Sequence, residues 1–199
     1  VPKRIFETNK DVKIICVLRN PVDRAYSQFW DNKRHLTETG SFENAFSKYS
    51  NYQQYESGKI GYFTRGFYAD YLERYYNLFP KENILLLKTE DLKNNFEESI
   101  LICHEFLGLK NLSYKTTQIK SNESYTYNNI FYKLIFNYSF INRNIPYNIK
   151  KFSFFGRTSK FSYPHLDKDI RKDLTSYFWK HNEKLEKLTN LNLSNWKIN

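Results

Sequence analysis

The sequence predicts an α/β fold with a parallel central sheet, and two short apolar runs joined by helical patterns carry this prediction. Residues 14–18 and 83–88 are rich in β-branched and aliphatic side chains, which is typical of strands buried on both faces of a parallel sheet. Between these runs, apolar residues recur at three- and four-residue spacing, as they do in amphipathic helices. The order strand, helix, helix, strand, helix indicates an α/β architecture, so we expect the two strands to be adjacent and parallel.

Four helices are predicted before residue 110, each from its apolar spacing and from a residue that begins or ends it. They are residues 21–34 with Pro21 first, a short helix from Ser41 through Phe46, residues 65–79 before Pro80, and about residues 95–107 before Gly108.

The second half of the chain has a weaker pattern until its last 35 residues. Apolar residues from Ile170 to Leu188 mark a long C-terminal helix, and a further helix is predicted near residues 128–138. The rest of residues 110–165 is predicted to be a long loop, which in a compact protein is functional or disordered. A chain of 199 residues fits one domain, and we predict a single domain over residues 1–199.

The net charge of +10 is concentrated in the second half of the chain. Residues 1–110 hold 16 basic and 15 acidic side chains, whereas residues 111–199 hold 15 and 6. This excess predicts an anionic partner, such as a nucleotide, a nucleic acid, a sulfated or phosphorylated ligand, or a membrane surface. Lys and Asn are abundant throughout the chain, so a bias in base composition of the genome is a second explanation for the total charge.

Cysteine and methionine usage bears on the compartment and on the extent of the chain. Cys16 and Cys103, the two cysteines, fall in a strand and a helix pattern, so we expect buried thiols in a reducing, cytoplasmic compartment. Two cysteines and four histidines make no metal-ligand spacing, and no run approaches the roughly 20 apolar residues of a membrane span. The chain has no Met and begins at Val1, so we expect a piece of a longer protein, in which an anchor or targeting segment could precede it.

The strongest candidate site lies in KIICVLRNPVDRAYSQFW, residues 13–30. Arg19 follows a predicted strand at the carboxyl edge of the sheet, where open α/β folds bind ligands. The helix that begins at Pro21 directs its free N–H groups and the positive end of its dipole to the same edge. Ser27 lies about two turns into this helix, so a guanidinium and a hydroxyl could form a seat for a phosphate. A surface arginine and an inert helical serine would give the same pattern.

The same segment resembles the 3'-phosphate-binding segment of sulfotransferases that use 3'-phosphoadenosine-5'-phosphosulfate (PAPS). The matching residues are Arg19 at the end of the strand, Asn20-Pro21 after it, and Ser27 on the helix. Similar motifs follow in order: SFENAF, RGFYADYLERYYNLFPKENILLLKTEDL, CHEFLGL, YPHLDKDIRKDLTSYFWKHNEKL and LSNW. The similarity is greatest to the carbohydrate branch, which includes heparan-type enzymes. It implies a P-loop-type three-layer sandwich, PAPS as co-substrate, no metal and a glycan as acceptor.

The resemblance also assigns a nucleotide-wrapping loop to residues 154–164. Relatives carry Lys-Gly-Arg just before Tyr-Pro; here Arg157, Ser159 and Lys160 give the loop its basic character and are candidates for nucleotide contacts. The first strand of the family, its phosphate loop and its usual catalytic carboxylate have no counterpart before Ile14. The resemblance therefore implies a sulfotransferase domain that is incomplete at its N-terminus and inactive alone, with its catalytic residues unassigned.

The predicted reaction of the intact enzyme is in-line transfer of a sulfuryl group from PAPS to a hydroxyl or amine of an acceptor. Asp31 stands where some relatives have His, and it is either a base or a solvated helix-surface carboxylate. Tyr68 could face the acceptor cleft or pack in the core. Two other functions stay open: a basic nucleic-acid-binding module, and an inactive sulfotransferase-like domain that binds glycans.

Overall fold

The computed structural model describes residues 1–34, 38, 40–50, 61–110, 125–127, 157–160 and 163–197. The chain divides into two compact units. One unit comprises Val1–Ala25, Glu56–Thr117 and Asp167–Asn199, and the other comprises Tyr26–Tyr55 and Gln118–Leu166.

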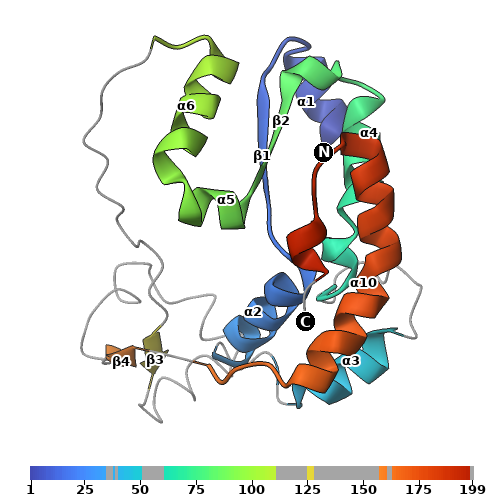
Figure 1. Ribbon diagram of the computed structural model, residues 1–199, viewed down its shortest axis with the longest axis vertical. Helices are drawn as coiled ribbons and strands as arrows, with labels where there is room; N and C mark the ends of the chain where they lie inside the picture. The colour runs from blue at the N-terminus through green and yellow to red at the C-terminus, as the bar shows by residue number, and fades with distance from the viewer. Residues whose placement is uncertain are drawn as a thin grey trace, which may run out of the picture. The chain divides into compact units, whose positions relative to one another are not determined.

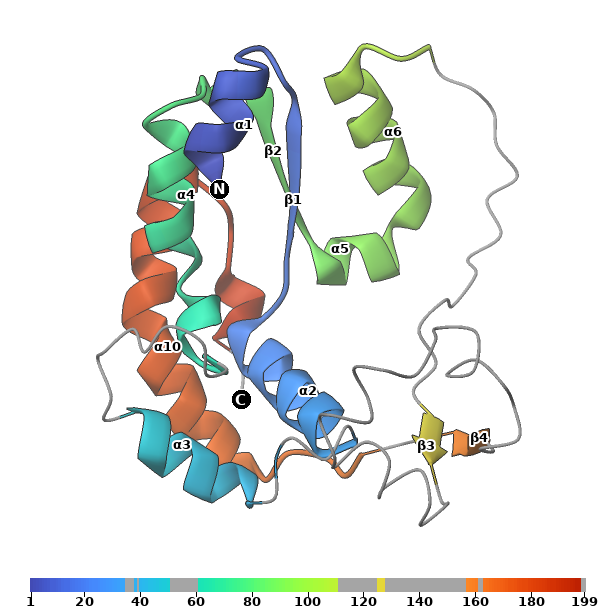
Figure 2. The same ribbon diagram turned by 180° about the vertical axis from the view of Figure 1, so that it is seen from behind.

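The first unit is built on two parallel strands, with helices on both sides (Figure 1; Figure 2). The strands β1 and β2 pair from Ile14 opposite Ile84 to Leu18 opposite Lys88. The helices α4 and α10 cover one side, and α5 and α6 lie on the other. The elements of this unit are α1 (Pro2–Thr8), β1 (Ile14–Leu18), the start of α2 (Pro21–Arg34), η1 (Thr64–Gly66), α4 (Tyr68–Tyr76), η2 (Lys81–Asn83), β2 (Ile84–Lys88), α5 (Thr89–Asn94), α6 (Phe96–Leu107), α10 (Lys168–Thr189) and η4 (Ser194–Trp196).

The predicted strands and their parallel pairing are confirmed, but the burial predicted for β1 is wrong. Ile15 and Val17 are 38% and 52% exposed, whereas Leu18 on the opposite face is 6% exposed. The reason is that α5 and α6 pack mainly on β2, so among the described residues only the α4 side of β1 is closely covered. The β2 strand also begins one residue later than predicted, because Asn83 belongs to the turn η2.

The predicted helices 21–34 and 95–107 are confirmed, the second with Gly108 in the left-handed conformation at its end. The predicted helix 65–79 is shorter, since the backbone leaves the helical region at Phe67, and only Tyr68–Tyr76 is α-helical. The short helices α1 and α5 were not predicted. The helix predicted near residues 128–138 lies outside the described residues.

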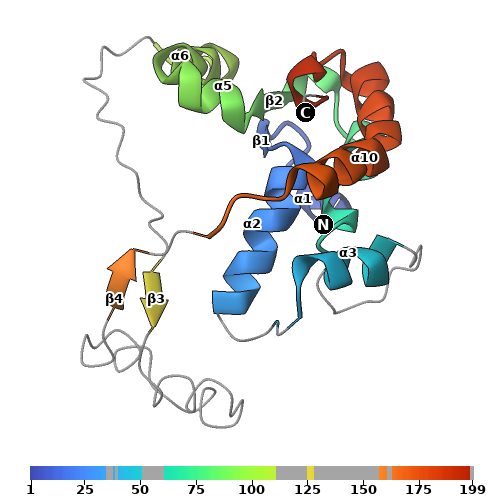
Figure 3. The same ribbon diagram turned by 60° about the horizontal axis from the view of Figure 1, so that its bottom comes forward.

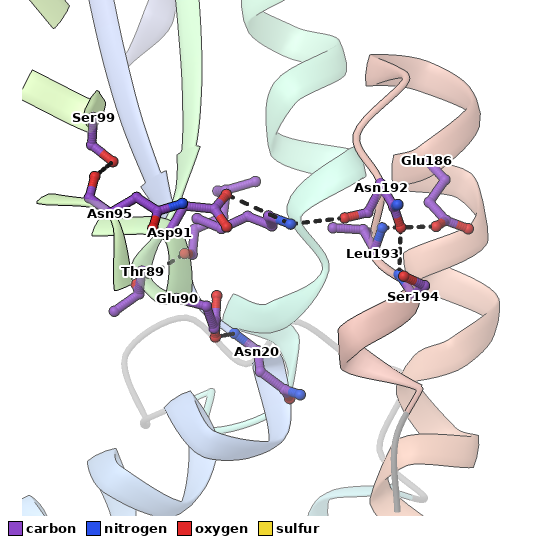
Figure 4. A network of polar contacts seen from close by, with 12 residues as sticks. Asn20, Thr89, Glu90, Asp91, Asn95, Ser99, Glu186, Asn192, Leu193 and Ser194 are labelled. Atoms are coloured by element: carbon purple, nitrogen blue, oxygen red, sulfur yellow. Dashed lines mark hydrogen bonds and ion pairs between the residues drawn. The ribbon is translucent and has the colours of Figure 1, made fainter. Parts of the chain in front are cut away.

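The core of the first unit joins the end of β1 to α4, α10 and the C-terminal turn. Its buried members are Leu18, Ala69, Leu72, Leu185, Leu193 and Trp196. A hydrogen bond also joins the C-terminal segment to β2. The Lys88 ammonium donates it to the Asn192 carbonyl (3.0 Å; Figure 4). The first turn of α10 is capped by Asp167, whose carboxylate accepts from the amides of Asp169 and Ile170. Distant parts of the chain therefore meet around the end of β1.

The second unit contains the rest of α2, the helix α3 (Phe42–Ser50), and the antiparallel strands β3 (Tyr125–Tyr127) and β4 (Arg157–Lys160), which Figure 3 shows side by side. The short helix predicted from Ser41 is confirmed but ends later, at Ser50, and the Ser41 hydroxyl caps it by accepting from the Asn44 amide (3.2 Å). The prediction of loop throughout residues 154–164 is wrong, because residues 157–160 are a strand. Pairing with a segment some 30 residues away gives no local signal.

None of the helices in the described ranges is long and apolar enough to cross a membrane. Nor do the His, Cys, Asp and Glu side chains of these ranges form a group that could hold a metal ion. Cys16 and Cys103 are half-buried free thiols, and burial raises the pKa of both.

Gly66 is required by the close approach of η1 to α10 and to the first residue of α2. A Cβ at this position would lie 2.8 Å from the Phe178 ring and 2.8 Å from the Pro21 Cβ. Both neighbours are fully buried, so neither can move away at low cost.

We predict that Gly66→Ala lowers the free energy of unfolding by about 1–3 kcal/mol, because it forces an additional carbon into a packed region. Urea denaturation followed by circular dichroism measures this loss. Gly108→Ala is a suitable comparison. Gly108 has a positive φ of 72°, but no atom lies near a Cβ built at this position. Its replacement should therefore lower the free energy of unfolding by only about 1 kcal/mol, from backbone strain alone. Equal stability of Gly66→Ala and the wild type would contradict the close packing.

Candidate functional site

The turn between β1 and α2 is held by three side chains from two other places in the chain, the start of α4 and the start of α5. The Leu18 carbonyl accepts a hydrogen bond from the Thr89 hydroxyl (2.9 Å), and the Arg19 carbonyl accepts one from the Tyr68 hydroxyl (2.9 Å). The Asn20 amide donates to Glu90 Oε1 (3.1 Å), and Figure 4 shows the Glu90 carboxylate directed at that amide. Three consecutive residues of the main chain are thus fixed where the strand ends.

Asn20 begins the helix that follows. Its side-chain Oδ1 accepts from the Val22 amide (3.0 Å), and its carbonyl accepts from the Arg24 amide (2.9 Å). Asn20 is only 7% exposed, so this cap is shielded from water. Because Pro21 has no N–H, the cap satisfies the first amide of the helix that needs a partner.

Arg19 extends from this fixed turn. Its side chain is half-buried, and its guanidinium forms no hydrogen bond or ion pair with another described residue. Arg24 and Arg65 lie within electrostatic reach. Burial lowers the pKa of Arg24, and the charges of Arg65 and Arg19 lower it further, while Tyr68 and Tyr71 act in the opposite direction. Three guanidinium groups near the end of one strand favour the binding of an anion.

An aromatic pocket of about 400 Å³ adjoins this cluster. Its walls are residues of β1, η1 and α4, namely Cys16, Leu18, Arg65, Tyr68, Tyr71, Leu72 and Tyr75. The predicted packing of Tyr68 in the core is confirmed, since its ring lies 6.2 Å from the Trp196 ring. Its ring also lines this pocket, and a role of the pocket as the acceptor cleft stays a prediction. Burial raises the pKa of the Tyr68 hydroxyl, so at neutral pH it stays protonated and donates to Arg19.

Ser27 lies within α2 but belongs to the second unit, and it is half-buried. The preceding residue, Tyr26, donates its hydroxyl to the Pro164 carbonyl (2.9 Å), and Trp30 stacks on Tyr163 with ring centroids 6.2 Å apart. The Tyr-Pro end of the predicted nucleotide loop thus packs against the helix that carries Ser27. The pairing of Ser27 with Arg19 stays a prediction.

Arg157, Ser159 and Lys160 lie in β4, opposite Tyr127, Thr126 and Tyr125 in turn, with an irregularity between Thr126 and Tyr127. The structure describes the backbone of these residues, and their contacts with a nucleotide stay a prediction. Asp31 is exposed on α2, in keeping with a carboxylate on the helix surface.

Comparison with known proteins identifies the family. The model of the sulfotransferase domain matches residues 1–190. The chain belongs to the sulfotransferase domain family. It is 27% identical over 192 residues to the bifunctional heparan sulfate N-deacetylase/N-sulfotransferase 2 of Mus musculus, covering 94% of this chain and 20% of that protein.

Other sulfotransferases are similar over different extents. The heparan sulfate glucosamine 3-O-sulfotransferase 3B1 of Mus musculus is 30% identical over 115 residues, which are 56% of this chain and 28% of that protein. A crystal structure of a sulfotransferase from Alicyclobacillus acidocaldarius superposes with a TM-score of 0.67 at 23% identity, covering 99% of this chain and 62% of that one. The chain thus has the sulfotransferase fold and spans about a fifth of the first heparan sulfate relative.

Thr89, Glu90 and Arg65 were not predicted as part of the site of this sulfotransferase domain. Thr89 and Glu90 directly follow β2, the strand parallel to β1, and the carboxyl ends of parallel neighbours meet at one edge. That position is the signal that could have revealed them. No such sequence signal marks Arg65, which does not follow a strand. Its position in the site depends on the turn η1 and on the packing of Gly66.

We predict that Asn20→Ala destabilises the domain by about 1 kcal/mol, because the Val22 amide loses its cap. Asn20→Ser, which keeps a capping oxygen, should retain most of the stability. Chemical denaturation of both variants measures the difference. If the alanine and serine variants unfold at the same denaturant concentration, the cap contributes nothing to stability.

Proposed function

We propose that residues 1–199 form a single sulfotransferase domain that binds the 3'-phosphate of PAPS, for sulfuryl transfer to a carbohydrate. The observation that carries this proposal is the Arg19 guanidinium. It extends from a turn held by Thr89, Tyr68 and Glu90, next to two more arginines and without an acidic partner among the described residues. A dianionic phosphate would relieve the repulsion among these groups and accept charge-assisted hydrogen bonds from the guanidinium fork.

The reaction moves one sulfuryl group. An oxygen or nitrogen of the acceptor bonds to sulfur as the bond from sulfur to the phosphate oxygen of PAPS breaks, and adenosine 3',5'-bisphosphate leaves. The acceptor proton passes to a base, which we do not assign. By analogy with phosphoryl transfer, alignment of donor and acceptor supplies much of the rate. Arg19 contributes to this alignment because it holds the 3'-phosphate, which is the phosphate of PAPS that does not carry the sulfuryl group.

The other predicted residues complete the nucleotide site in this proposal. Ser27 donates its hydroxyl to the 3'-phosphate, and Arg157, Ser159 and Lys160 contact the nucleotide from β4. The packing of Tyr163 and Pro164 on α2 supports the assignment of the β4 residues to the nucleotide. It holds the segment that follows β4 against the helix that carries Ser27.

We propose a glycan as the acceptor. The similar proteins are named for heparan sulfate, an anionic polysaccharide, and residues 111–199 of this chain carry a basic excess of 15 against 6. Opposite charge would attract such an acceptor. The tyrosines of the pocket next to Arg19 offer faces on which a sugar ring can pack.

We predict that the chain binds adenosine 3',5'-bisphosphate more tightly than adenosine 5'-monophosphate, and that Arg19→Ala removes this preference. The loss should be about 10- to 100-fold in affinity for the bisphosphate, which is the usual worth of hydrogen bonds to a charged group. Ser27→Ala should lower the affinity for the bisphosphate by a smaller factor. Isothermal titration calorimetry with both nucleotides measures the preference.

Arg4→Ala is the matched control, because Arg4 is an exposed arginine on α1 and its loss changes the net charge equally. If Arg19→Ala and Arg4→Ala bind the bisphosphate equally well, the assigned phosphate seat is wrong.

The assigned residues hold the donor but none is assigned to the sulfuryl group, so we expect the chain alone to bind nucleotide without transferring sulfate. An assay with labelled PAPS and a desulfated heparan acceptor tests this. A glycan-binding domain without activity would bind the acceptor but show no preference for the 3'-phosphate. A nucleic-acid-binding module would instead bind DNA or RNA with an affinity that falls steeply as salt is raised.

A further inference from the structure

We propose that Tyr68, Thr89 and Glu90 are positioning residues for Arg19, which set the direction of its guanidinium by fixing the main chain of residues 18–20. The inference rests on the proposed function, because it takes Arg19 as the ligand of the 3'-phosphate. It adds three residues that would act on phosphate affinity without contacting the phosphate.

The three hydrogen bonds act on consecutive residues. Thr89 holds the Leu18 carbonyl, Tyr68 holds the Arg19 carbonyl, and Glu90 holds the Asn20 amide, at 2.9, 2.9 and 3.1 Å. They come from two directions, since Tyr68 begins α4 on one side of the sheet and the other two begin α5 after β2. A peptide restrained from both sides has little freedom to rotate about its axis, and that rotation would swing the Arg19 side chain.

A guanidinium without a partner depends on its backbone for direction. No hydrogen bond or ion pair from a described residue orients the Arg19 fork. The guanidinium of Arg19 must match two phosphate oxygens at once to form two hydrogen bonds. Each restraint on the backbone therefore lowers the conformational entropy that Arg19 loses when the ligand binds.

The position of Glu90 leaves the arginine charge available to a ligand. Its Oε1 accepts from the Asn20 amide, while Oε2 is buried and accepts no hydrogen bond from a described residue. Glu90 forms no ion pair with Arg19 or Arg65 among the described side chains. The carboxylate therefore restrains the main chain of Arg19 without neutralising its guanidinium.

The test compares variants that remove one bond with variants that keep it. Tyr68→Phe and Thr89→Val each remove a hydroxyl at nearly constant volume, and Glu90→Ala removes the acceptor. Thr89→Ser and Glu90→Gln keep a hydroxyl and a side-chain oxygen in place. Asp91→Ala is the control, because Asp91 lies in the same turn of α5 but pairs with Lys88 (3.6 Å) and is half exposed.

For each variant, calorimetry gives the affinity for adenosine 3',5'-bisphosphate and for adenosine 5'-monophosphate, and thermal unfolding monitors the fold. We expect the three bond-removing variants to lose about three- to tenfold in affinity for the bisphosphate and to bind the monophosphate as the wild type does. Thr89→Ser, Glu90→Gln and Asp91→Ala should keep the preference. If these residues had only a structural role, their substitution would lower the affinity for both nucleotides by the same factor.

The outcomes separate this inference from the proposed function. If Arg19→Ala loses the preference for the 3'-phosphate but Tyr68→Phe and Thr89→Val keep it, the phosphate seat stands and the positioning role is refuted. An equal loss for both nucleotides also refutes it. If the wild type shows no preference at all, the proposed function fails and this inference fails with it. Should Glu90→Ala not fold, Tyr68→Phe and Thr89→Val decide the question.

Discussion

The main chain at the end of β1 is the feature on which the rest of the first unit depends. Leu18, Arg19 and Asn20 carry polar groups out of the sheet at a point where regular strand pairing ends. A buried main-chain group without a partner costs about 1–3 kcal/mol, and here Thr89, Tyr68 and Glu90 supply the partners. The turn is therefore stable only when β2, α5 and α4 are all in place.

The same arrangement connects stability with binding. The core around Leu18 and Trp196 packs α4 and the C-terminal turn against the sheet, which brings the Tyr68 hydroxyl to the Arg19 carbonyl. Gly66 allows η1 to approach Pro21 and Phe178, and the next residue back is Arg65. Apolar packing thus brings three arginines near one another, and the charges of Arg65 and Arg19 lower the pKa of Arg24. A bound anion would favour the charged form of these side chains.

The exposed face of β1 shows how far an apolar pattern can predict burial. The run Ile14–Leu18 predicts a strand correctly, since β-branched residues favour extended backbone. Burial of Ile15 and Val17 depends on which element covers them, and α5 and α6 pack mainly on β2. The limits of α4 are a similar case. Its apolar spacing extends from residue 65 to residue 79, but the backbone leaves the helical region at Phe67, so residues 64–66 form the separate turn η1.

The sequence by itself determined the strands and major helices of the first unit, the placement of Arg19 at a strand end, and membership of the sulfotransferase family. These follow from local patterns and ordered motifs that a linear chain displays. Only the tertiary structure decided that Thr89, Glu90 and Tyr68 hold the Arg19 turn and that Arg24 and Arg65 lie beside it. The reason is physical: partners 49 to 71 residues apart in the chain meet only when the sheet pairs and the core closes.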